Sequence, residues 1–152
     1  MVCDEKGFTL LELLLVLLIT AFSLAAATPA LEQAMSRQRL DSSALQLAWV
    51  LRSAQEEAIY SGQDNMVRFY YATNSYLAGT STRYYLEGAQ YAAVPNFPTQ
   101  IGRVPACIFQ PSGIPRSGGT VVLVNSQNEQ RYVIVSPVAG RVRISDQPPA
   151  GW

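Results

Sequence analysis

The sequence predicts an α+β protein in which one long N-terminal helix precedes a domain of antiparallel strands. Three observations lead to this prediction. Residues 8–30 form an apolar run of 23 residues in which Glu12 is the only charged side chain. Residues 31–61 contain no Gly or Pro and are rich in Ala, Leu, Gln and Arg. Beyond Gly62, short β-prone runs alternate with Gly- and Pro-containing turns, so we expect the strands to pack on the C-terminal half of the helix.

The apolar run is long enough to cross a membrane. As a helix it would span about 34 Å, compared with a hydrocarbon core of roughly 30 Å. A carboxylate inside a bilayer costs about 2.5–3.5 kcal/mol and normally marks function. Residues 8–30 contain no Lys or Arg that could pair with Glu12. A cut after Gly7 would create a cation on Phe8, one helical turn from Glu12.

Two other interpretations of this segment compete. One is an ordinary secretory signal cleaved at the alanines 25–27. Two features argue against a secretory signal. The leader has two negative charges, Asp4 and Glu5, and one positive charge, Lys6, where a net positive charge is expected, and Glu12 lies inside the apolar run. The other is a plain single-pass anchor that carries a glutamate by chance.

The segment Lys6-Gly7-Phe8-Thr9-Leu10-Leu11-Glu12, followed by an apolar helix, resembles the class III signal of type IV pilins and pseudopilins. The resemblance implies a prepilin peptidase that cuts after Gly7 and methylates Phe8. It also implies that Glu12 helps to recruit the subunit to a growing filament. The expected partners are other pilins or pseudopilins and the filament assembly platform. The expected location is the inner membrane, crossed once, with the C-terminal domain in the periplasm or outside.

The second half of the helix is predicted to be amphipathic. Apolar side chains recur at three- and four-residue steps, which is typical of a helix that packs on a domain. These side chains are Leu40, Ala44, Leu47, Ala48, Leu51, Ala54 and Ala58. Pro29 predicts a kink or a break, and Gly62 predicts the helix end. A helix from Phe8 to Ser61 would be about 80 Å long.

The rest of the chain predicts strands and turns. Expected strands cover residues 66–71, 83–87, 107–110, 120–124, 130–135 and 141–144. The runs 120–124 and 130–135 form the strongest hairpin. Prolines predict an irregular loop over 88–105, and a turn is expected at 73–75. The chain therefore divides into a leader (1–7), a transmembrane half-helix (8–30), an amphipathic half-helix (31–62) and a β-rich domain (63–152).

The β-rich domain resembles the GspH/FimT group of minor pilins and pseudopilins. The residues that carry this resemblance are Phe109-Gln110-Pro111-Ser112-Gly113, then a Gly-rich turn and a strand hairpin, then Gly140-Arg141-Val142-Arg143. The resemblance implies the pilin-like fold for the whole chain.

Composition argues against catalysis. The chain has no His, and no cofactor or metal is expected. Glu56 and Glu57 are adjacent on a helix, so they do not face each other as an acid–base pair. Removal of residues 1–7 leaves ten basic and nine acidic groups, and Cys107 as the one thiol. We therefore predict that the protein is not an enzyme, with a membrane-anchored or secreted enzyme as the remote alternative.

One further candidate site is the Gly140-Arg141-Val142-Arg143 motif. In a strand, Arg141 and Arg143 lie on one face about 7 Å apart, which matches neighbouring phosphates of a nucleic acid. Arg131 on the preceding strand would join them if the register permits, and so would the loop residues Arg103 or Arg116. FimT-like minor pilins of DNA-uptake pili are associated with DNA binding through such a motif.

Two readings of these arginines stay open at the sequence level. Arginine on an exposed edge strand also discourages edge pairing. A GspH-like pseudopilin of a type II secretion system would need no DNA binding. The sequence does not distinguish between a type II secretion system, a type IV pilus and a competence pilus.

Overall fold

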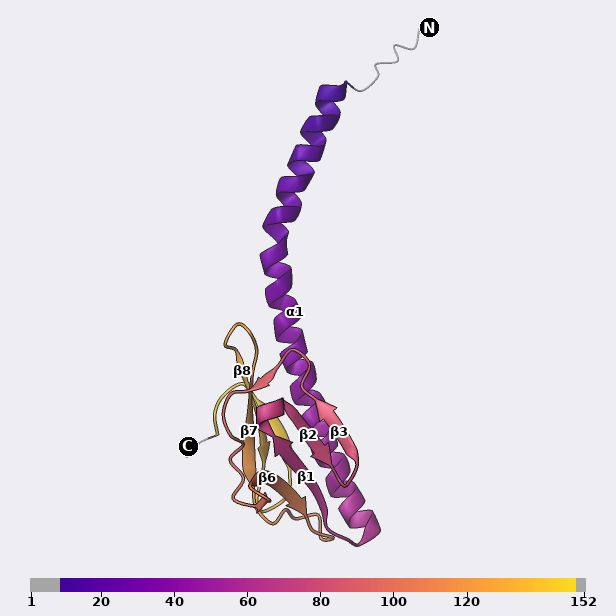
Figure 1. The fold of residues 1–152 in the computed structure, drawn as a ribbon, viewed down its shortest axis with the longest axis vertical. Helices are drawn as coiled ribbons and strands as arrows, with labels where there is room; N and C mark the ends of the chain where they lie inside the picture. The colour runs from indigo at the N-terminus through magenta and orange to yellow at the C-terminus, as the bar shows by residue number, and fades with distance from the viewer. Residues whose placement is uncertain (1–8, 150–152) are drawn as a thin grey trace. The chain divides into compact units, whose positions relative to one another are not determined.

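The computed structural model describes residues 9–149, which form one α-helix, one short 3-10 helix and nine strands. Gly7 and Phe8, on which the cleavage prediction falls, lie outside the described residues. The chain divides into two compact units, Met1–Met35 and Ser36–Trp152, and α1 (Leu10–Ser61) belongs to both (Figure 1).

Helix α1 begins after Thr9, whose Oγ1 accepts a hydrogen bond from the Glu12 N–H at 3.2 Å. It ends at Ser61, and the following Gly62 has φ +66° and donates its N–H to the Ala58 carbonyl. Both ends agree with the usual capping chemistry.

Helix α1 runs through Pro29 to Ser61, as the predicted long helix requires, so of the kink or break expected at Pro29 the break does not occur. A helical proline lacks the N–H that would bond to the carbonyl four residues back, here that of Ala25. The Thr28 hydroxyl donates to this carbonyl at 2.9 Å instead. The neighbouring side chain therefore satisfies the acceptor that the proline leaves open, which is how apolar helices tolerate proline.

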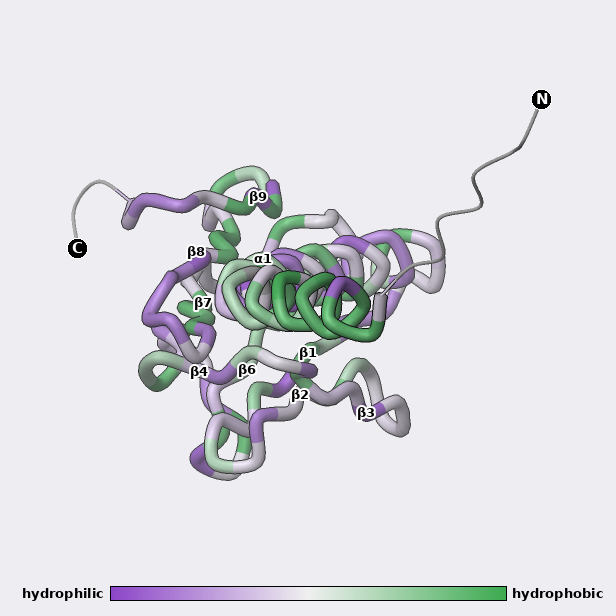
Figure 2. The backbone as a smooth tube through the Cα atoms, turned by 90° about the horizontal axis from the view of Figure 1, so that it is seen from above, coloured by the Kyte–Doolittle hydropathy of each residue, from purple (hydrophilic) through white to green (hydrophobic). Residues whose placement is uncertain are grey.

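Within residues 10–35, every side chain for which burial is described is exposed. The most apolar window of 18 residues in α1 has a mean hydropathy of 2.5, so the helix is long and apolar enough to cross a membrane. Leu14 and Leu17 are each 56% exposed. The apolar turns at the start of α1 appear in the hydrophobic colour in Figure 2.

The second unit contains two antiparallel sheets. The five-stranded sheet has the order β3-β2-β1-β6-β5, and the four-stranded sheet has the order β4-β7-β8-β9. The strands are β1 (Asn65–Tyr70), β2 (Ser75–Ala78), β3 (Thr82–Tyr85), β4 (Gln90–Tyr91), β5 (Gln100–Ile101), β6 (Val104–Phe109), β7 (Gly119–Val124), β8 (Gln130–Val135) and β9 (Val142–Ser145). The short helix η1 (Tyr71–Thr73) joins β1 to β2.

The predicted hairpin is confirmed as β7–β8, paired from Gly119↔Val135 to Val124↔Gln130. Two expectations need correction. Strand β2 begins at Ser75, inside the predicted turn, and residues 88–105, expected as an irregular loop, contribute β4, β5 and the start of β6. Strand β4 exists because it pairs with β7, about 30 residues later. Such pairing depends on tertiary context rather than on local propensity.

The core of the second unit lies between α1 and the inner faces of both sheets. The predicted helix stripe is buried in full, with Leu40, Leu47 and Leu51 at 0% exposure. Strand residues of the core are Val67, Phe69, Cys107, Phe109, Val121, Leu123, Val133, Val135 and Val142. Viewed from above, β1, β6 and β7 lie beside α1 (Figure 2).

Candidate functional site

The first candidate site is Glu12, in the first turn of α1. Its main-chain N–H donates to Thr9 Oγ1. Within residues 9–149 its carboxylate has no hydrogen bond or ion pair. The positive end of the helix dipole favours a carboxylate at this position. Within the described residues, Glu12 therefore presents an unpaired carboxylate at the start of an exposed apolar helix.

The second candidate site is β9, at one edge of the four-stranded sheet. Val142 pairs with Val135 and is buried, whereas Arg143 pairs with Ile134 and is exposed. Arg141 lies just before the strand, and its carbonyl accepts the Ser136 N–H at 3.0 Å. Both arginines are exposed on either side of Val142, but Arg141 lies outside the strand in which it was expected, because β9 begins at Val142. Neither side chain has a partner within the described residues.

Arg131 does not join this pair, contrary to the expectation from sequence. It shares a face of β8 with the buried Val133 and Val135, opposite to the face that carries Arg143. Its Nε donates to Asp41 Oδ1 on α1 at 2.7 Å, and its side chain is 15% exposed. Of the loop arginines, Arg116 forms an ion pair with Asp64.

Tyr132 takes the position that was expected of Arg131. It pairs with Ser145 of β9, and so lies on the same face as Ile134 and Arg143. Its hydroxyl donates to Gln130 Oε1 at 2.6 Å. Sequence reasoning missed this residue because register decides which face a residue occupies. Assignment of Val133 and Val135 to the core would have turned Tyr132 outward.

Gly140, named with the arginines as a DNA contact, is buried and has φ +63°. A Cβ atom at this position would lie 2.5 Å from both Gln55 Nε2 and the Gly113 carbonyl oxygen. Gln55 Nε2 donates to that same carbonyl at 2.7 Å. The structure therefore gives Gly140 a packing role against α1.

Helix α1 also fixes the start of β9. An Arg52 Nη donates to the Val142 carbonyl at 3.0 Å. This bond and the close approach at Gly140 place the Arg141–Arg143 segment relative to the C-terminal half of α1.

Within residues 9–149, no group of three or more His, Cys, Asp or Glu side chains is placed to hold a metal ion. Cys107 is buried, and burial raises the pKa of its thiol to about 12.

An apolar N-terminal helix that carries one carboxylate, followed by antiparallel sheets packed on the rest of the helix, defines the pilin-like class of proteins. Family comparison agrees. The prokaryotic N-terminal methylation motif matches residues 3–28, and the type II transport protein GspH model matches residues 43–140, more than half of the chain. The chain belongs to the GspH family.

Solved structures show the same fold. The minor pseudopilin EpsH from the type 2 secretion system of Vibrio cholerae is 21% identical with a TM-score of 0.58, and the match covers 70% of this chain and 96% of EpsH. The type IV minor pilin FimU of Pseudomonas aeruginosa is 15% identical with a TM-score of 0.56, and the match covers 72% of this chain and 90% of FimU. No curated protein matches the chain.

These findings confirm the GspH/FimT-like resemblance and the pilin-like fold, and they place the chain among minor pilins and pseudopilins. The GspH match ends at Gly140, so Arg141 and Arg143 lie beyond it. Membership of the family therefore rests on the N-terminal motif and the domain, and is independent of the arginine pair.

Proposed function

We propose that this protein is a minor subunit of a type IV filament, cleaved by prepilin peptidase between Gly7 and Phe8 and then incorporated from the inner membrane. The C-terminal domain would lie on the periplasmic or outer side. The observation that carries the proposal is the Glu12 carboxylate, the only charged side chain within residues 8–30 and without a partner in the described residues. The role is structural, without cofactor or catalysis.

Cleavage would supply the missing cation. The new α-amino group on Phe8 and the Glu12 carboxylate would be one helical turn apart. Pairing of the two charges offsets part of the cost of burying either one in lipid. The pair can form within one chain or between staggered neighbours, so it favours insertion of the subunit beside another helix.

Glu12→Gln keeps the shape of the side chain and removes its charge. We expect normal cleavage, with a mature chain that begins at methylated Phe8 by mass spectrometry, and at least a tenfold loss of incorporation into sheared filaments. Glu32→Gln, exposed on the same helix, is the matched control and should incorporate normally. Unchanged incorporation of Glu12→Gln would refute its role, and a mature chain that begins near Thr28 would indicate ordinary secretion.

We also propose that Arg141 and Arg143 bind DNA phosphates at the filament surface. The supporting observation is that both are exposed without a partner in the described residues, on either side of Val142, whose carbonyl accepts a hydrogen bond from Arg52 of α1. The alternative is that the protein is a pseudopilin of a type II secretion system and does not bind DNA. Membership of the GspH family supports the secretion role.

Fluorescence anisotropy with the full chain in detergent and a labelled DNA duplex distinguishes DNA binding from the secretion alternative. Each phosphate contact contributes about 0.9 to the slope of log affinity against log salt. The Arg141→Ala/Arg143→Ala variant should therefore bind more weakly, with a slope lower by about 1.8. Arg37→Ala/Arg39→Ala, at two exposed positions of α1, is the control for charge alone. Equal binding by both variants would overturn the site, and no binding by the parent would favour the secretion alternative.

A further inference from the structure

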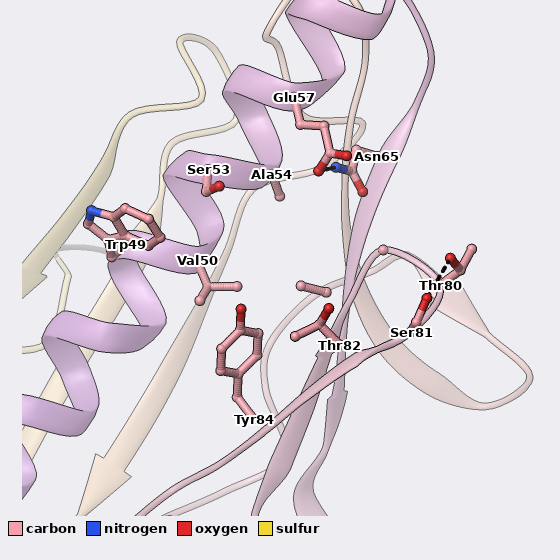
Figure 3. Close-up of a pocket in the computed structure, with 12 residues that line it drawn as sticks. Trp49, Val50, Ser53, Ala54, Glu57, Asn65, Thr80, Ser81, Thr82 and Tyr84 are labelled. Carbon is pink, nitrogen blue, oxygen red and sulfur yellow. Dashed lines mark hydrogen bonds between the residues drawn. The ribbon is translucent and has the colours of Figure 1, made fainter.

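We infer that a pocket between α1 and the β2–β3 hairpin binds a neutral sugar ring, either free or within a glycan. This inference goes beyond the filament role. The pocket lies within the second unit, between residues 49–57 of α1 and strands β1 to β3 (Figure 3). Its volume of about 240 Å³ is smaller than the roughly 300–1,000 Å³ of pockets that hold drug-sized ligands, so it suits a single ring.

Most of the polar side chains that line the pocket carry a hydroxyl group. They are Ser53 of α1, Thr80 and Ser81 of the turn, and Thr82 and Tyr84 of β3. Thr80 and Ser81 bond to each other at 3.2 Å. Within residues 9–149, the hydroxyl groups of Ser53, Thr82 and Tyr84 have no hydrogen-bond partner. In Figure 3 Thr82 and Tyr84 face α1 from β3, so their hydroxyl groups are available to a ligand between the two elements.

The carboxylate of Glu57 is held at one side of the pocket by Asn65. Asn65 Nδ2 donates to Glu57 Oε2 at 2.7 Å, and Asn65 Oδ1 accepts the Met66 N–H at 2.8 Å (Figure 3). Glu57 Oε1 has no hydrogen bond in the part of the chain that the structure describes. It is a strong acceptor in a fixed position, because hydrogen bonds to an ionised group are roughly twice as strong as neutral ones.

Two aromatic rings complete the pocket. Tyr84 stacks on the buried Tyr76 with ring centres 5.3 Å apart, which fixes the orientation of the Tyr84 ring. Trp49 is 67% exposed, and its indole N–H has no acceptor among the described residues. The C–H groups of a sugar ring form an apolar face that packs on an exposed aromatic ring, and an indole N–H donates to a sugar oxygen.

These groups favour a ligand rich in hydroxyl groups over a cation. A free hydroxyl group on the protein both donates and accepts, so its best partner does the same. An ammonium or guanidinium group only donates, so it would satisfy Glu57 and leave the hydroxyl protons of the pocket unbonded. Sugar hydroxyl groups satisfy the carboxylate and the hydroxyl groups together. The negative charge of Glu57 disfavours an acidic sugar, which leaves a neutral one.

Trp49 serves as the reporter of binding. The chain has two tryptophans, and Trp152→Phe leaves Trp49 as the only one. The full chain, in polyoxyethylene detergent micelles that contain neither sugar nor cation, is titrated with the methyl glycosides of glucose, galactose, mannose and N-acetylglucosamine. We expect at least one glycoside to change the Trp49 fluorescence saturably, with a Kd of about 1–10 mM. The corresponding uronic acid should bind about tenfold more weakly, because Glu57 repels its carboxylate.

Two variants in this background test the pocket. Tyr84→Phe keeps the ring and removes the hydroxyl group, and Glu57→Gln keeps the shape and removes the charge. Each should weaken sugar binding about tenfold, the effect of one lost hydrogen bond. Tyr60→Phe and Glu56→Gln, exposed on α1 and outside the pocket, are the matched controls and should bind as the parent does. Circular dichroism of each variant establishes that the fold is kept.

Two outcomes would overturn the inference. They are that no glycoside binds, and that both pocket variants bind as tightly as the parent. Lysine amide and methylguanidinium are included as cationic probes. If they bind in a Glu57-dependent manner and no glycoside does, the pocket is a cation site instead.

An oligosaccharide of the sugar that binds distinguishes a glycan from a free sugar. Only a chain of sugars gains affinity from contacts beyond the pocket, so tighter binding of the oligosaccharide would identify a glycan. Because no variant of Glu12, Arg141 or Arg143 is used, failure here leaves the proposed filament role intact.

Discussion

Burial controls the chemistry of Cys107 on β6. The side chain is 0% exposed, and burial raises the pKa of its thiol from an ordinary value near 9 to about 12. Below pH 9 both the folded and unfolded states keep the proton, and the contribution to stability is fully present. As the pH rises from 9 through 12, the unfolded chain ionises first, so this contribution is lost.

We therefore predict that the Cys107 thiol of the folded protein resists thiol reagents at pH 8. Cys3→Ser makes Cys107 the only cysteine. Labelling with an aromatic disulfide reagent should be at least a hundredfold slower in buffer than in denaturant, because only the thiolate of an opened chain reacts. Equal rates in the two solutions would show that the thiol is accessible.

A comparison of Gly140 with Gly102 separates two reasons for a glycine, a left-handed backbone and close packing. Gly140 has φ +63° and a Cβ would clash with Gln55 and Gly113, whereas Gly102 has φ +58° and nothing within 4 Å. We expect Gly102→Ala to cost about 1 kcal/mol and Gly140→Ala to cost about 2–4 kcal/mol, because overpacking adds to the backbone strain. Urea unfolding of both variants measures the difference, and equal costs would contradict the clash.

At the scale of elements, α1 serves as both an apolar anchor and the support of the sheets. Its C-terminal half contributes a stripe of buried side chains to the core and also hydrogen-bond donors to loops and strand ends. Strand β9 depends on these donors, because it is short and lies at a sheet edge. An edge strand with few ladder bonds opens more easily than a central one.

Arg52→Ala removes the donor to the Val142 carbonyl. We predict a loss of about 1–2 kcal/mol in stability, since the acceptor is left without its partner. Amides of β9 should exchange with deuterium about tenfold faster, with little change in β1. Arg37→Ala, which is exposed on the same helix, should change neither. Uniform acceleration across both sheets would show a global effect instead of a local one.

For the whole molecule, the core lies entirely in the second unit. The first buried apolar residue is Leu40, and every member of the core cluster follows it. Residues 10–35 contribute no buried side chain among those described. The apolar segment is therefore free to serve the membrane or the filament without a cost to the domain.

We predict that a chain beginning at Ser36 folds without the apolar segment. It should be soluble, unfold cooperatively in urea, and show dispersed amide signals by NMR, because burial on folding is retained in full. A matched chain beginning at Ala48 lacks Leu40, Ala44 and Leu47 of the core and should not fold. Aggregation or a non-cooperative transition of the Ser36 chain would contradict this prediction.

The sequence by itself determined much of this protein. The long helix, its buried stripe, the β7–β8 hairpin, the motif around Glu12 and the membership of a pilin-like family all follow from local signals. Periodicity, capping residues and an uninterrupted apolar run depend on neighbouring positions, so they can be recognised in the sequence without a structure.

The tertiary structure decided what depends on contacts between distant residues. The Thr28 hydroxyl donates to the Ala25 carbonyl, which Pro29 leaves without its helical donor. Strand β4 exists only through its pairing with β7. Strand register put Tyr132 rather than Arg131 on the face of Arg143, since a shift by one residue exchanges the two faces of a strand.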